Sequence, residues 1–207
     1  MIVTLEEVLG MDAYSNWGRI ESTGTWGEVL SWAARKAVSE KRALLAVQPG
    51  VDLPARSREI LLRHILAEEM ICAPTILSMD NRTIELTQEL ASGYPDMKWA
   101  MGTYEQGGEP TQVVCFDHGV IGIPYEALVE VGNFDRGFNE YFVLCDWTVR
   151  ARWHGHQVYL CHDAPMTVPN HQTFSAVFRG REEAAALLDR EHFERKWGGA
   201  VLKNLSP

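Results

Sequence analysis

The side chains best suited to catalysis or ligand binding lie in the stretch from Gly132 to His171. Asp135 follows residues that tolerate tight turns, and its carboxylate can cap the element that comes next. Asp146 lies four positions before Arg150, which puts both side chains on one face of a helix. Carboxylate and imidazole side chains are common proton carriers in catalysis. The stretch therefore combines a turn, a helical carboxylate and a late histidine.

Ordinary structural roles are also open to these residues. An Asp and an Arg four positions apart form a common helix pair worth about 0.2 to 0.5 kcal/mol. A lone Asp after a strand, such as Asp52, is often a helix cap or a solvated residue, and a lone His such as His171 is often only hydrogen-bonded. On a predicted strand, His156 and His162 lie about 20 Å apart, too far to share a metal ion.

The elements around these residues alternate between helix and strand, as in an α/β sheet. Residues 26–40 have apolar side chains at helical spacing, and a β-rich run at 43–47 follows. The loop from Gln48 to Asp52 then leads into a second helical stretch, and such a corner is a common ligand position in open α/β sheets. Further helices are predicted at 56–68, 124–131 and 144–154, and strands at 70–77, 113–116, 120–123 and 156–161.

The remaining parts of the chain have weaker patterns. Residues 1–23 are expected to be an irregular N-terminal segment, and residues 80–90 a turn with a short amphipathic piece. Residues 92–111 are rich in Gly and Pro, which favours an exposed loop around a short strand near Trp99. Residues 181–197 form a predicted C-terminal amphipathic helix, with Ala185, Leu188 and Phe193 on its apolar face.

Length and composition indicate one ordinary globular domain over residues 1–207. A chain of 207 residues can hold one substantial core, and a hydrophobic content of 46% is ordinary for such a domain. The formal net charge of −9 opposes binding to phosphate backbones, so no nucleic-acid partner is expected. No stretch approaches the roughly 18 apolar residues of a membrane span.

The cysteines indicate a reducing environment. The chain has four of them, with neither CxxC nor zinc-ligand spacing, and they are expected to be buried thiols. The N-terminal residues are acidic where a signal peptide would be basic. A cytoplasmic location is therefore predicted for the chain. The four are Cys72, Cys115, Cys145 and Cys161.

The stretch that begins at Gly132 resembles the C-terminal half of the GT-A glycosyltransferases, in particular glycosyltransferase family 2. That family reads approximately Gly-Gly-Phe-Asp-Glu-x-Phe, then an acidic pair, Asp-Leu-x-x-Arg, a helix-ending Gly and a late His. Residues 43–54 are similar, more loosely, to the family's strand and metal loop, and the likeness covers roughly residues 24–175. The matching positions of the first motif are Gly132, Phe134, Asp135, Phe138, Asp146, Arg150, Gly155 and His171.

This resemblance implies a GT-A-like, Rossmann-like mixed sheet flanked by helices, without much of the usual N-terminal nucleotide-binding half. It implies a hexosyltransferase-type enzyme that transfers a sugar, with inversion, from a nucleotide-sugar such as a UDP-sugar to the hydroxyl of a carbohydrate or other acceptor. Asp146 would be the catalytic base, with Glu140 as the alternative. Gln48, Asp52 and His171 would bind the donor, the last two through a divalent Mn or Mg ion.

Departures from the family pattern support a different function. Val143 and Leu144 stand where the family has its acidic pair, one member of which is the catalytic base. In the metal loop, Gln48 and Gly50 stand where carboxylates are expected, which leaves Asp52. The alternative is a non-catalytic sugar- or nucleotide-binding module, or a subunit that acts with a second subunit or as a homo-oligomer. A purely structural α/β domain is the third hypothesis.

Overall fold

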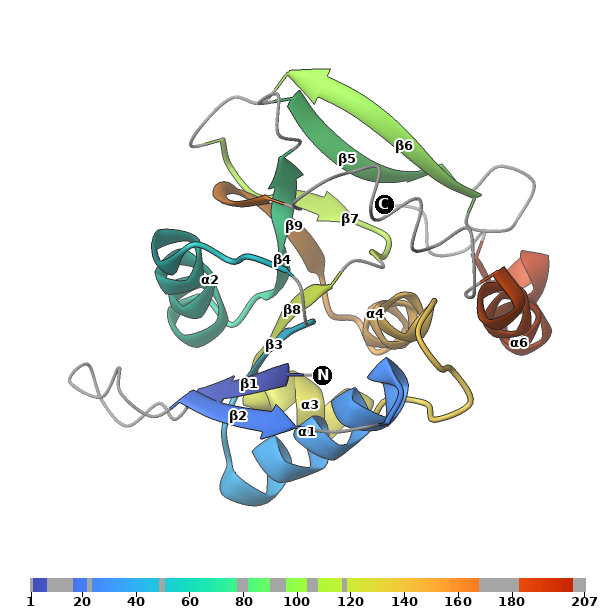
Figure 1. The fold of residues 1–207 in the computed structure, drawn as a ribbon, viewed down its shortest axis with the longest axis horizontal. Coiled ribbons are helices and arrows are strands. Elements are labelled where there is room, and N and C mark those ends of the chain that lie inside the picture. Colours follow the sequence, from blue (N-terminus) through green and yellow to red (C-terminus); the bar gives the residue numbers. More distant parts are fainter. Residues whose placement is uncertain are drawn as a thin grey trace.

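The computed structural model describes residues 2–6, 17–21, 24–48, 51–77, 82–89, 96–103, 108–116, 119–167 and 183–202. Within these ranges the chain has the mixed α/β architecture that the sequence predicts (Figure 1). The main sheet has the strand order β3-β8-β4-β5-β6, and β9 pairs with both β4 and β7. Its strands are β3 (Leu44–Val47), β4 (Ile71–Leu77), β5 (Arg82–Glu89), β6 (Asp96–Thr103), β7 (Thr111–Val113), β8 (Val120–Ile123) and β9 (Val158–Thr167).

Parallel and antiparallel pairings meet at the centre of this sheet. Strand β9 runs parallel to β4, whereas β8 runs antiparallel to both β3 and β4. Side chains alternate between the two faces of a strand. Accordingly, Leu44 and Ala46 contribute to one hydrophobic core and Leu45 to the other. The sheet thus separates two cores.

The helices cover these two faces unequally. In Figure 1, α2 lies on one side of the sheet, and α1, α3 and α4 lie on the other. The larger core joins the second group of helices to the sheet, and the smaller core lies under α2. The described helices are α1 (Trp26–Glu40), α2 (Ala55–Ala67), α3 (Tyr125–Val131), α4 (Val143–Trp153) and α6 (Glu183–Leu202).

Helix α1 shows why the local sequence predicts its boundaries well. The Thr25 hydroxyl accepts a hydrogen bond from the Glu28 amide, and the Glu28 carboxylate accepts one from the Thr25 amide. This capping box satisfies amides that have no partner inside the helix. The helix ends at Lys41, whose left-handed backbone has a φ of 56°. Its predicted range of 26–40 is confirmed.

The N-terminal segment expected to be irregular contains two strands, which corrects that expectation. β1 (Ile2–Glu6) and β2 (Trp17–Glu21) pair antiparallel, from Ile2 opposite Glu21 to Glu6 opposite Trp17. Apolar and β-branched residues such as Ile2 and Val3 fit a strand. The partner strand lies more than ten residues away along the chain, so the local pattern did not identify the pairing.

A second correction concerns residues 82–103. They were expected to form a short amphipathic piece and a loop around a short strand near Trp99. The strand at Trp99 is present as β6, but it is longer than expected, and β5 replaces the amphipathic piece: the two pair along their full length, from Arg82 opposite Thr103 to Glu89 opposite Asp96. Polar and apolar residues alternate through β5, which is the period of a strand rather than of a helix. The two strands form a long ribbon that extends from the sheet (Figure 1).

Candidate functional site

Asp146, the predicted base, lies in the first turn of α4 inside a cluster of opposite charges. Its side chain is inaccessible to solvent. Oδ2 accepts a hydrogen bond from Arg150 Nε at 3.2 Å. Oδ1 lies 2.8 Å from both Lys196 Nζ and Trp197 Nε1, and both groups donate to it. Both carboxylate oxygens are therefore occupied by donors from the protein itself.

Arg150 extends this cluster to the turn that follows α3. Its Nη1 and Nη2 donate to the carbonyl oxygens of Val131 and Asn133, at 3.0 and 2.8 Å. Between them, Gly132 has a φ of 81°, a left-handed conformation that favours glycine, and its carbonyl accepts a hydrogen bond from Trp147 Nε1. The Gly, Asp and Arg of the family-like motif are thus joined in one structural unit.

The C-terminal helix α6 supplies side chains to this unit that sequence reasoning missed. Lys196 bridges Asp146 and Asp135, with Nζ 2.7 Å from Asp135 Oδ2. In the other direction, the buried Asp189 carboxylate accepts hydrogen bonds from the backbone amides of Asn139, Glu140 and Tyr141, at 2.9 to 3.1 Å. Helix α6 and the loop between α3 and α4, residues 132–142 (the motif loop), therefore hold each other through an ion pair and through hydrogen bonds to a buried carboxylate.

The docking face of α6 differs from the predicted one. Phe193 is buried as expected, but Leu188 is 60% exposed, which corrects its assignment to the apolar face. The helical segment runs from Glu183 to Leu202, and a kink at the non-helical Gly198 interrupts it directly after residue 197, the expected end of the helix. The residues that face the loop recur at helical spacing and are mostly polar, namely Asp189, His192, Phe193, Lys196 and Trp197.

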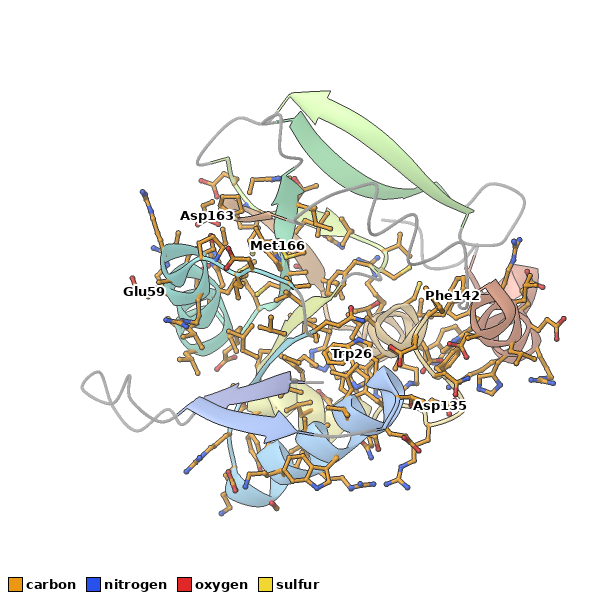
Figure 2. All side chains as sticks on the ribbon, in the orientation of Figure 1. Trp26, Glu59, Asp135, Phe142, Asp163 and Met166 are labelled. Atoms are coloured by element: carbon orange, nitrogen blue, oxygen red, sulfur yellow. The ribbon has the colours of Figure 1, made fainter. Side chains whose placement is uncertain are left out.

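Asp135, the motif carboxylate before α4, is held in its charged form. Partial burial raises its pKa, but hydrogen bonds from Lys196 and the Gly137 amide, the positive charge of Lys196 and a hydrogen bond from His192 outweigh burial and lower the pKa to about 2. The Gly137 amide donates to Oδ1 at 2.8 Å. Asp135 thus serves as an anchor for α6 (Figure 2).

The positions of the missing acidic pair belong to the hydrophobic core. Val143 is 0% exposed and Leu144 is 1% exposed, and both pack in the larger core. Their location at the start of α4 places them directly after Phe142, whose backbone is left-handed with a φ of 57°. A carboxylate at either position would lose its hydration without gaining a hydrogen-bonding or oppositely charged partner. These two residues stabilise the fold.

Glu140, the alternative base, is partly buried at the start of α1. Its Oε1 accepts a hydrogen bond from the Trp26 amide at 3.1 Å. The amides of a first helical turn have no intrahelical acceptor, and a negative charge there interacts favourably with the helix dipole. The next amide, of Gly27, donates to the Asn139 carbonyl at 2.8 Å. Glu140 therefore joins the motif loop to α1.

Gln48 and Asp52 lie at a separate corner, where β3 leads towards α2. The backbone amide of Gln48 donates to the Gly119 carbonyl at 2.6 Å, and the backbone carbonyl of Gln48 accepts from the Val51 amide at 3.2 Å. Gly119 allows this close approach, because a Cβ there would lie 2.8 Å from Gln48 Oε1 and from Val51 Cγ2. Asp52 is exposed. The predicted strand and helix are present, and Asp52 can meet a ligand from solvent.

The proposed metal pair of Asp52 and His171 stays a prediction, because His171 lies outside the described residues. In the part of the chain that the structure describes, the ligand atoms of His64, Cys161 and Asp163 lie close enough to share a metal ion, all within 4.8 Å of one another. This group lies between α2 and β9, and Figure 2 shows Asp163 beside α2, far from Asp135.

Neither a family model nor a curated protein matches the chain. Over the described residues, no helix combines the length and the apolar character needed to cross a membrane.

Proposed function

We propose that this chain is a non-catalytic, glycosyltransferase-like module that binds a nucleotide-sugar or its nucleoside diphosphate without transferring the sugar. The observation that carries the proposal is the state of Asp146, which is buried and bonded to Arg150, Lys196 and Trp197. A general base needs an oxygen within hydrogen-bond reach of the acceptor hydroxyl. The core positions of Val143 and Leu144 support the same conclusion.

The binding half of the proposal rests on the corner at Gln48 and Asp52. Its position after a strand and before a helix is one that α/β proteins use for ligands. The side-chain amide of Gln48 can replace a metal-bound carboxylate as a neutral hydrogen-bonding group. Because the chain has a net charge of −9, an anionic donor needs local positive charge, for which a Mn or Mg ion at Asp52 and His171 is the proposed source.

Sugar transfer is the second candidate function, and the exposed carboxylate of Asp52 is the observation that favours it. In that case the chain is an inverting, hexosyltransferase-type GT-A enzyme that uses a UDP-sugar and an acceptor hydroxyl, and a proton acceptor other than Asp146 takes part. Release of UDP from the donor distinguishes this candidate from a binding module.

The environment of the module is part of the same proposal. The cysteines in the described residues are buried thiols that form no disulfide, which suits a reducing cytoplasm. A binding module that does not react acts through what it recruits, so a carbohydrate, a second subunit or another copy of the chain is the proposed partner.

Thermal unfolding with UDP and with UDP-sugars, each with and without Mn, tests donor binding. A ligand that binds only the folded state stabilises it by about 2.7 kcal/mol at a concentration of 100 Kd. We expect a higher Tm with these ligands, and a smaller rise in Asp52→Asn. Glu59→Gln, an exposed carboxylate on α2, is the matched control and should respond like the wild type. An unchanged Tm with every ligand would rule out the proposed donor site.

A further inference from the structure

His64 occupies an unusual position on the inner face of α2, between two carboxylates. Its side chain is 4% exposed. Nδ1 lies 2.8 Å from Glu68 Oε2, and Nε2 lies 3.1 Å from Asp163 Oδ2. A neutral imidazole has one N–H group, so only one of these carboxylates can then accept a hydrogen bond from it. Both ring nitrogens have a favourable partner only if the ring is protonated or if one nitrogen binds a cation.

Cys161 completes a group of different ligand atoms at the Nε2 side of this histidine. The ligand atoms of His64, Cys161 and Asp163 all lie within 4.8 Å of one another. Cys161 and Asp163 are two positions apart on β9, which is the spacing of residues on one face of a strand. A nitrogen, a sulfur and an oxygen therefore converge from a helix and a strand.

The backbone of β9 is irregular where these ligands lie. Its register with β4 shifts between Pro74, which is opposite Cys161, and Ile76, which is opposite Met166. Irregularities of this kind re-aim side chains. The Ser57 hydroxyl, buried on α2, donates to the Pro165 carbonyl and so fixes this segment of β9 against the helix. The positions of Cys161 and Asp163 relative to His64 are thus built into the fold.

We propose that His64 Nε2, Cys161 Sγ and an Asp163 carboxylate oxygen bind a Zn²⁺ ion. Zinc binds imidazole, thiolate and carboxylate ligands in tetrahedral sites, and three protein ligands leave one position for water or another small ligand. Mn and Mg prefer oxygen ligands, so the thiolate selects against the ions proposed at Asp52. The proposal does not depend on the proposed function, since its ligands are not those proposed for the donor.

Glu68 has the role of orienting the histidine. Zinc-bound imidazoles usually donate their other N–H to a carboxylate or carbonyl, which fixes the tautomer and the ring. Glu68 Oε2 accepts such a hydrogen bond from Nδ1 when Nε2 binds the ion. Glu68 is therefore a positioning residue, and its removal should weaken the site without abolishing it.

Nearby groups set the proton and charge balance of the site. Zinc binding replaces the proton of the Cys161 thiol and requires an unprotonated Nε2, so protons are released to solvent. Arg63 Nη2 lies 3.2 Å from Asp163 Oδ2 and competes for this oxygen, but its side chain is 58% exposed and can turn away. Cys72 hydrogen-bonds to Cys161. This bond raises the pKa of Cys72, and burial and the nearby negative charges raise it further, so Cys72 stays a thiol.

Zinc titration of the reduced, folded full chain tests the proposal. Competition with a chromophoric chelator should show one Zn²⁺ per chain, and Co²⁺ in its place should give a thiolate-to-cobalt charge-transfer band. We expect Cys161→Ser to lose this band and Asp163→Asn, at a partly exposed position, to bind zinc at least tenfold more weakly. Glu68→Gln should weaken binding by about 10- to 100-fold.

The matched control is Cys145→Ser, because Cys145 is an equally buried thiol whose Sγ lies 3.1 Å from Cys115 Sγ and outside the site. It should keep the charge-transfer band and the wild-type zinc affinity. A folded wild-type chain that binds no zinc would overturn the proposal. So would unchanged zinc affinity in Asp163→Asn, or a cobalt band that is lost in Cys145→Ser and kept in Cys161→Ser.

Discussion

At the scale of single residues, a motif side chain can keep its identity and carry a structural role. Asp146 occupies a position at which the family resemblance implies proton transfer, yet its two oxygens bind Arg150, Lys196 and Trp197 inside the protein. Removal of one partner from a buried ion pair leaves an uncompensated charge. Substitution of Asp146 should therefore lower the free energy of unfolding more than substitution of any residue of the proposed ligand site.

Asp146→Ala should lower the free energy of unfolding by about 3 kcal/mol or more, because Arg150 and Lys196 lose their shared acceptor. Urea denaturation monitored by tryptophan fluorescence measures this change. Asp52→Ala is the control, and as an exposed residue it should change stability by less than about 0.5 kcal/mol. Equal effects of the two substitutions would contradict the structural role of Asp146.

The pKa of Asp135 predicts the pH dependence of stability. Since the pKa is lowered to about 2 from an ordinary value of 3.8, folding favours the charged form, and this stabilisation is present above pH 3.8 and is lost as the pH falls towards 2. Asp135→Asn should remove on the order of 1 kcal/mol at neutral pH, after allowance for solvent screening, and show a smaller decline between these pH values. Unfolding curves from pH 5 to pH 2 test this, and parallel declines in both proteins would refute it.

At the scale of elements, the motif loop depends on two helices that are remote in sequence. Helix α6 holds it through Asp189, which accepts from consecutive backbone amides. Helix α1 approaches from the other side, where the Gly27 amide donates to Asn139. The loop therefore has the conformation that its two neighbours impose.

Asp189→Ala should destabilise the protein by about 2 kcal/mol or more, because the amides of Asn139, Glu140 and Tyr141 lose a buried acceptor. Leu188→Ala, on the exposed side of α6, should have little effect. Hydrogen exchange of residues 139–141 provides a local readout. Unchanged protection of these amides in Asp189→Ala would show that α6 does not hold the loop.

Gly27→Ala should cost about 1 to 3 kcal/mol, the range for an overpacked site. A Cβ at residue 27 would lie 2.1 Å from the Phe138 carbonyl oxygen, so α1 and the loop must separate. Arg35→Ala, on the exposed side of α1, is the control for helix propensity and should be near neutral. A fully stable Gly27→Ala protein would contradict the close contact between α1 and the loop.

At the scale of the whole molecule, the sequence predicts the elements whose information is local. The helical spacing of residues in α1, α2 and α4 sufficed for their approximate bounds. The pairing of β1 with β2 depends on a partner more than ten residues away, and the local pattern did not reveal it. β5 and β6 are neighbours in sequence, and the alternating pattern of β5 was overlooked. The fold class was predictable for this reason, and the full strand content was not.

The site was predictable only in part, because its key contacts join distant segments. Local sequence placed Gln48 and Asp52 at a strand-to-helix corner, and this corner is present. It did not show that Lys196 reaches Asp146, since the docking face of α6 is polar and a search for apolar spacing overlooks it. The zinc-ligand spacing rules likewise missed Cys161, whose proposed co-ligand His64 lies on another element.

The central claim is that the chain binds a nucleotide-sugar and does not transfer the sugar. The most direct measurement is calorimetric titration of the full chain with UDP-sugars in the presence of Mn, with UDP release followed in the same samples. The account predicts saturable binding to at least one donor, and UDP release no faster than in a protein-free control. UDP release above that control, and reduced in Asp52→Asn protein, would contradict it.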